Sequence, residues 1–258
     1  MSVMAWSEEE VGLITAATAQ WHDMEILTRQ APEGITITDN TKEMECLLVT
    51  GPNARKILEP ITEGHDLSAS WLSISMEGTV AGHKCALARV SFAGELGWEI
   101  HCANDAAPAI WDAITVAGAK PFGMWALNSL RIEKGYRAWK GDLSTDYSLL
   151  EGGLDRFVKL DKEVDFPGKA AMLAEKQQGV AKRFVTLTVA AGTCDAPYMS
   201  TLWQGDEVVG ETTSGAWGYR VNASIALGML RTDLAIPGTE IEVEIYGQRH
   251  KAVVQEDQ

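Results

Sequence analysis

Hydrophobic positions recur with two different periods along the chain, and the change between them divides the sequence. In the first part, Ile110, Trp111 and Ile114 recur at helical spacing. In the last part, Ile241, Val243 and Ile245 alternate with glutamates, as in a strand with one buried face. We therefore predict an α+β protein: antiparallel sheets with packed helices over residues 1–179, then a small C-terminal antiparallel β-barrel lobe over residues 180–258.

Turn residues and capping residues place the individual elements. The apolar run Val11–Ile14 follows a possible capping box, Ser7 with Glu10, and could open a helix or form a strand; we favour a strand. Asn104 is a candidate helix cap, and Gly135 a candidate helix terminator. The remaining predictions are helices near 18–29, 53–58, 123–134 and 170–176, and strands at 46–49, 85–92, 155–159 and 184–189.

Composition narrows the class of protein. The chain has 258 residues, 46% of them hydrophobic, and a net charge of −14 that disfavours nucleic acid or an anionic membrane surface as a ligand. The four cysteines form no CxxC pair and the five histidines show no metal-ligand spacing, so we predict no metal site. The start of the chain has no secretory signal pattern, and the expected location is the cytoplasm.

A glycine-rich segment, Gly94-Glu95-Leu96-Gly97-Trp98-Glu99, follows a predicted strand. Two glycines allow a tight turn and let a flat ligand approach the backbone closely. A carboxylate at Glu99 could accept two parallel hydrogen bonds from the N–H groups on the edge of a heterocycle. The alternative is a plain hairpin turn with solvent-facing carboxylates, which composition alone favours.

Two further segments could carry chemistry. Arg131 lies near the end of a predicted helix, where a guanidinium could hold a ligand carboxylate, pair with Glu99, or form a surface ion pair with Glu133 or Asp142. Trp217 lies in the glycine-rich segment 213–219, which could cover a flat ligand as a loop or form an ordinary barrel turn.

Several motifs together resemble the glycine-cleavage T-protein family, with the closest likeness to the C-terminal folate domains of sarcosine and dimethylglycine dehydrogenases and oxidases. Their order and spacing match across nearly the whole chain. The resembling segments are 49–55, 94–99, 127–136, 165–169, 213–215 and 224–228.

The resemblance implies α+β lobes closed by a β-barrel lobe, with tetrahydrofolate at the centre. It implies that Glu99 reads the pterin edge and that Arg131 contacts the folate. Phe92 replaces a tyrosine that family members often carry, so only ring packing is expected there. The family's aspartate near folate N10 precedes the matching part, so no catalytic residue is assigned, and the family's tyrosine-bearing tail is not matched either. We accordingly expect a truncated gene product or a subunit that a partner chain completes.

The function implied is folate-dependent one-carbon transfer of the aminomethyltransferase type. A flavoprotein partner, carrying any FAD, would oxidise an N-methyl amine such as dimethylglycine or sarcosine, and tetrahydrofolate would accept the carbon as 5,10-methylenetetrahydrofolate. The alternatives are a non-catalytic folate-binding or interaction subunit and a partly folded remnant.

Overall fold

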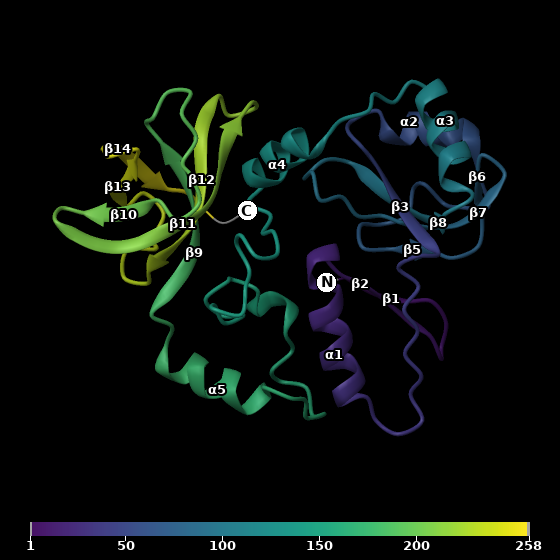
Figure 1. Ribbon diagram of the computed structural model, residues 1–258, viewed down its shortest axis with the longest axis horizontal. Helices are drawn as coiled ribbons and strands as arrows, with labels where there is room; N and C mark the ends of the chain where they lie inside the picture. Colours follow the sequence, from purple (N-terminus) through teal and green to yellow (C-terminus); the bar gives the residue numbers. More distant parts are fainter. Residues whose placement is uncertain (1, 257–258) are drawn as a thin grey trace. The chain divides into compact units, whose positions relative to one another are not determined.

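A computed structural model describes residues 2–256, and Figure 1 shows its helices and strands. The fold class is confirmed: helices with antiparallel sheets are followed by a closed six-stranded antiparallel barrel. The chain divides into two units, residues 1–123 and 124–258. The predicted domain boundary at residue 180 lies between the last helix and the barrel, and it stays a prediction. Among the described residues, no helix combines the length and apolarity that a membrane crossing requires.

The first unit begins with an antiparallel hairpin. Strands β1 (Ser2–Ala5) and β2 (Val11–Ile14) pair, and helix α1 (Gln20–Gln30) follows after the short 3-10 helix η1 (Ala17–Ala19). The strand prediction for Val11–Ile14 is thus confirmed over the helix alternative. The hydroxyl of Ser7 accepts hydrogen bonds from the backbone N–H groups of Glu9 and Glu10, so it stabilises the hairpin turn instead of capping a helix.

The main sheet of the first unit has the strand order β3-β8-β7-β6-β4, with β5 beside β7. One face packs against helices α2 and α3, burying Trp98, Ile100 and Cys102 because alternate residues of β8 point the same way. The other face carries Glu99 and His101. The elements are β3 (Met44–Thr50), α2 (Ala54–Leu58), η2 (Glu59–Ile61), β4 (Thr62–Glu63), β5 (Ile74–Ser75), β6 (Thr79–Val80), β7 (His83–Ala88), β8 (Gly97–Ala103) and α3 (Ala107–Val116).

The second unit is a barrel with the strand order β10-β11-β12-β9-β14-β13, against which helix α4 packs. Ile241, Val243 and Ile245 are buried, as their alternation predicts. Gly135 ends α4 with a positive φ of 75°, also as predicted. The elements are α4 (Met124–Glu133), η3 (Asp155–Phe157), α5 (Lys169–Gln178), β9 (Lys182–Val189), β10 (Thr201–Gln204), β11 (Glu207–Gly218), β12 (Ala223–Arg231), β13 (Glu240–Ile245) and β14 (Gln248–Val254).

Three local predictions are wrong. Asn104 does not cap α3; its side-chain amide donates instead to the backbone oxygen of Lys42. Residues 155–157 form a 3-10 helix and not a strand. The glycine-rich segment 213–219 lies almost wholly within strand β11 and is therefore not a loop. For Asn104 and for the segment 213–219 the partner lies in a segment distant in sequence, which a local pattern does not contain.

Gly215 on β11 packs directly against Ala196 in the segment before β10. A β-carbon there would lie 2.2 Å from the backbone oxygen of Ala196, far inside van der Waals contact. We expect Gly215→Ala to lower the free energy of unfolding by about 1–3 kcal/mol, measured by urea denaturation, because overpacking forces the backbone to shift. Gly123→Ala, where an added β-carbon meets no atom within 4 Å, is the control. Equal stability of the two variants would contradict this account.

Candidate functional site

The turn before β8 holds the first candidate residue, Glu99. Gly94 adopts a positive φ of 69°, a conformation that glycine takes without strain. At Gly97 a β-carbon would lie 2.9 Å from both the backbone oxygen of Val49 and the side chain of Ser91. Both glycines are therefore needed, one for the direction of the turn and one for the close packing of β8 on β3. The turn fixes where the strand begins and hence which face Glu99 occupies.

Glu99 is held on the face of the sheet opposite the core. Its side chain is 21% exposed, and one carboxylate oxygen lies 3.2 Å from Nε2 of the buried His101. The two residues are neighbours because side chains two positions apart share a face of a strand. The plain-hairpin alternative expected a fully solvent-facing carboxylate. The structure instead shows Glu99 as a half-buried group with a neighbour that limits its rotation.

The opposite face of β8 anchors this arrangement. Trp98 is 1% exposed and lies under the guanidinium of Arg89, 4.7 Å from the ring centroid. A buried indole with a cation over its face resists sliding of the strand, because a shift by one residue would expose it. Phe92, the aromatic candidate before the glycine turn, is 36% exposed. Its ring is therefore accessible at the surface of this unit.

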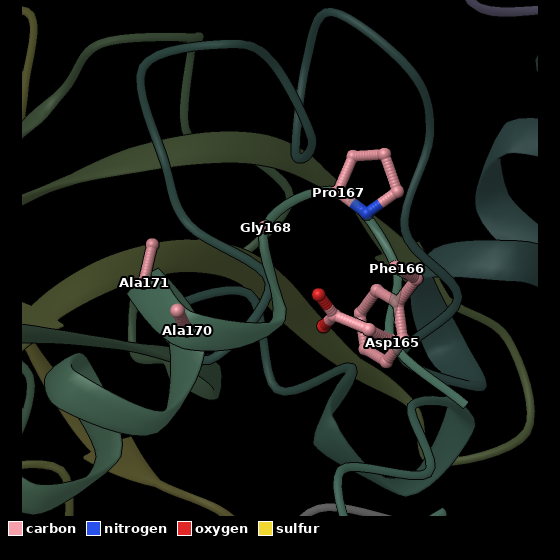
Figure 2. Close-up of a pocket in the computed structure, with 6 residues that line it drawn as sticks. All are labelled: Asp165, Phe166, Pro167, Gly168, Ala170 and Ala171. Carbon is pink, nitrogen blue, oxygen red and sulfur yellow. The ribbon is translucent and has the colours of Figure 1, made fainter. Parts of the chain in front are cut away.

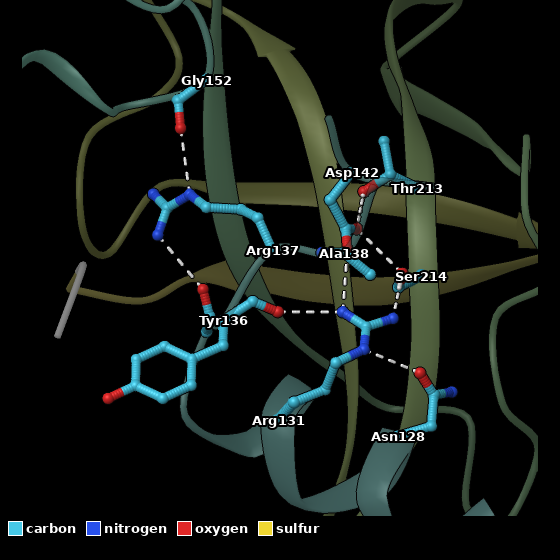
Figure 3. A network of polar contacts seen from close by, with 10 residues as sticks. Asn128, Arg131, Tyr136, Arg137, Ala138, Asp142, Gly152, Thr213 and Ser214 are labelled. Atoms are coloured by element: carbon cyan, nitrogen blue, oxygen red, sulfur yellow. Dashed lines mark hydrogen bonds and ion pairs between the residues drawn. The ribbon is translucent and has the colours of Figure 1, made fainter. Parts of the chain in front are cut away.

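Arg131, the second candidate, belongs to the other unit and is almost completely buried at 6% exposure. Its guanidinium donates to the side-chain oxygen of Asn128, the backbone oxygen of Tyr136, the carboxylate of Asp142 and the hydroxyl of Ser214 (Figure 3). Of the partners considered from sequence, Asp142 is the one found, but the pair is buried and not at the surface. The guanidinium thus has a structural role, and its contact with folate stays a prediction.

Asp142 is the centre of this buried network (Figure 3). It has no exposed surface, pairs with Arg131 at 2.7 Å, and accepts from the backbone N–H of Ala138 and the hydroxyls of Thr213 and Ser214. A buried carboxylate requires this density of donors to offset its lost hydration. The Thr-Ser-Gly segment of β11 is accordingly explained by structure: two hydroxyls serve Asp142 and the glycine allows close packing.

Trp217, the fourth candidate, follows two residues after Gly215 on the same strand. Its side chain is partly buried, and its backbone oxygen accepts a hydrogen bond from the hydroxyl of Ser129 at 2.7 Å. This contact ties α4 to β11. The strand position replaces both the covering loop and the barrel turn that the sequence suggested, so Trp217 could pack on a ligand but could not close over one as a mobile loop.

A surface pocket lies in the second unit, where the chain enters α5 (Figure 2). Its lining consists of Asp165, Phe166, Pro167, Gly168, Ala170 and Ala171. None of the four predicted folate residues is among them. The pocket coincides with the segment predicted to be a turn and a helix start. Asp165 is the one titratable group in its lining, and the other lining residues are apolar, so the pocket offers little chemistry.

The structure also brings together a group that sequence reasoning missed. The side-chain donor atoms of Cys46, Glu99 and His101 lie within 4.8 Å of one another. Cys46 on β3 is directly opposite His101 on β8 in the strand register. The two-residue spacing of Glu99 and His101 in a strand predicts that they share a face. The sequence does not predict that Cys46 lies beside them, because 55 residues separate it from His101 and only the register of the sheet joins them.

Together the fold defines a class: an α+β region followed by an antiparallel barrel, with a carboxylate displayed after a glycine turn. The family model for the GCVT N-terminal domain matches residues 1–162, and the model for the glycine cleavage T-protein C-terminal barrel domain matches residues 182–257. The chain belongs to the glycine cleavage T-protein family.

Individual relatives agree with this assignment. The chain is 35% identical to human mitochondrial dimethylglycine dehydrogenase over 98% of its own length and 30% of the relative's. It is 32% identical to an aminomethyltransferase of Listeria welshimeri, over 96% of this chain and 68% of that one. The crystal structure of glycine cleavage system aminomethyltransferase T from Bartonella henselae matches with a TM-score of 0.79 at 23% identity, covering 93% of this chain and 66% of that chain. The chain thus spans under a third of the dehydrogenase relatives it matches.

Proposed function

We propose that this chain binds tetrahydrofolate and serves one-carbon transfer. The observation that carries the proposal is the half-buried Glu99, held by His101 on an otherwise non-core sheet face directly after a glycine turn. A carboxylate in this setting is restrained in direction yet accessible on one side. Membership of the T-protein family supports the same reading.

The residues present fit a reduced pterin. A carboxylate is acceptor-only, and the pterin edge presents an N–H beside an amino group, so Glu99 can accept two parallel hydrogen bonds. The glycines of the turn leave room for a flat ring near the backbone, and the ring of Phe92 offers an apolar surface nearby in sequence. Burial of Glu99 strengthens these hydrogen bonds because water competes less well for the carboxylate.

Arg131 and Trp217 have supporting roles in this proposal. Arg131 holds α4 against β11 through Asp142 and Ser214, which keeps the second unit in one shape for its ligand. A direct contact of Arg131 with folate, and packing of Trp217 on it, remain predictions. Tetrahydrofolate would supply the two nitrogen atoms, N5 and N10, that take up the one-carbon unit.

The one-carbon unit is proposed to come from an N-methyl amine of the dimethylglycine or sarcosine type. Similarity to dimethylglycine dehydrogenase supports this source, although the chain spans only 30% of that relative. Oxidation of the N-methyl group would then belong to a flavoprotein partner carrying FAD. The measurement is formation of 5,10-methylenetetrahydrofolate by the chain with and without a co-expressed flavoprotein. Product that forms only with the flavoprotein would support oxidation by the partner and carbon transfer by this chain.

The folate proposal is tested by calorimetric titration of the full chain with folinic acid. We expect a saturable heat with one site per chain. p-Aminobenzoylglutamate, which lacks the pterin, should bind much more weakly, because Glu99 is assigned to the pterin edge. A flat titration with folinic acid would refute folate binding. Equal affinity for the two ligands would refute the role of Glu99.

A further inference from the structure

Cys46, Glu99 and His101 form a cluster of three different donor types on one face of the main sheet. Cys46 and His101 are cross-strand partners, and Glu99 lies two residues before His101 on the same face. A soft sulfur, an imidazole nitrogen and a carboxylate oxygen are the three ligand types that zinc takes from proteins. The three come from two adjacent strands, which are rigid elements that hold ligand atoms accurately.

From this arrangement we propose that Cys46, Glu99 and His101 bind a divalent transition-metal ion of the zinc class. Typical bond lengths of about 2.0–2.3 Å in a tetrahedral site place ligand atoms about 3.3–3.6 Å apart. The three donor atoms lie within 4.8 Å of one another, and Glu99 and His101 are already 3.2 Å apart. Closing on an ion thus requires movements of about 1 Å, which side-chain rotations supply without a change in the strands.

The carboxylate of Glu99 and the thiolate of Cys46 would bring negative charge to a divalent cation. Binding would release the thiol proton to solvent and form the metal–sulfur bond. Cys46 is exposed, so an ion from solution can reach it.

Three protein ligands leave one position of a tetrahedral ion open, for water or for another ligand. This site would revise the expectation from sequence that the chain holds no metal. It does not depend on folate binding, but it uses the same carboxylate. Metal and pterin should therefore exclude each other at Glu99.

The direct test is titration of the reduced, untagged chain with Co²⁺, followed by the thiolate-to-cobalt charge-transfer absorption. We expect the band to saturate at one ion per chain. Cys46→Ser should abolish the band. It should also weaken Zn²⁺ binding by at least roughly tenfold, because removing a residue that only supports a metal ligand already costs about that much affinity. Cys194→Ser, which changes a cysteine of the other unit, should leave the band intact. Absence of the band, or its survival in Cys46→Ser, would overturn the proposal.

Two further measurements need no folded variant of Cys46. Zn²⁺ but not Mg²⁺ should protect Cys46 of the unaltered chain from alkylation, as read by peptide mapping; equal labelling with and without Zn²⁺ would overturn the site. Saturating Zn²⁺ should also suppress the folinic acid titration if folate binds at all. If Glu99→Gln weakens folinic acid binding but Zn²⁺ leaves that binding intact, Glu99 is not a metal ligand and the three-donor site is overturned. If folinic acid does not bind, the cobalt band and the alkylation result still decide the metal proposal.

Discussion

Asp142→Asn is expected to lower the free energy of unfolding by about 3–5 kcal/mol, because it leaves the guanidinium of Arg131 buried without its countercharge. For a chain of this size such a loss corresponds to a fall of roughly 6–20 °C in the melting temperature. The change keeps the volume of the side chain, so a cavity does not contribute. Differential scanning calorimetry measures the shift directly.

Asp206→Asn is the matched control, since it removes the same charge from an exposed position between β10 and β11. Its melting temperature should stay close to that of the unaltered chain, because exposed carboxylates contribute little. A double-mutant cycle with Arg131→Met separates the ion pair from its surroundings. The double variant should lose less stability than the sum of the single variants. Additive losses would show that the two residues act independently, against the geometry of Figure 3.

This network also shows where sequence reasoning ends. The end of α4 at Gly135 was predictable, because a helix terminator acts within a few residues and leaves a local signature. Asp142 was a candidate partner for Arg131, but only as a surface pair. Its burial depends on the hydroxyls of Thr213 and Ser214, more than 70 residues later in the chain. The local spacing of apolar residues does not indicate such a contact.

The strands show the same division. Strand β13 alternates between isoleucine or valine and glutamate because one face is buried and the other meets solvent, so the sequence alone predicts this strand. Strand β12 is buried along nearly its whole length, since one face lines the barrel and the other packs with Ile132 of α4. Its sequence therefore shows no alternation of apolar and polar residues. The place of Cys46 in the cluster could not be predicted for a similar reason, because it depends on the pairing of β3 with β8.

Glu99→Gln is expected to weaken binding of folinic acid by roughly a hundredfold, about 3 kcal/mol, which is the upper range for hydrogen bonds to a charged group. The amide of glutamine has one acceptor oxygen and one donor nitrogen. Of the two N–H groups on the pterin edge, one keeps an acceptor and the other faces a donor, so one hydrogen bond is lost and a repulsive contact replaces it. The neighbour His101 can still contact the amide oxygen, which preserves the local fold.

The control for this variant is Glu45→Gln, an exposed position on the neighbouring strand β3. It removes the same charge from the same unit, so a long-range effect of net charge would appear equally in both variants. Calorimetric titration should give unaltered affinity for Glu45→Gln and a hundredfold loss for Glu99→Gln, with both proteins melting near the unaltered chain. Because Glu99 is restrained on a partly buried face, its effect should be specific to ligands that present the pterin edge. Equal affinities in the two variants would mean that the carboxylate after the glycine turn does not read the ligand, and that the chain binds folate elsewhere or not at all.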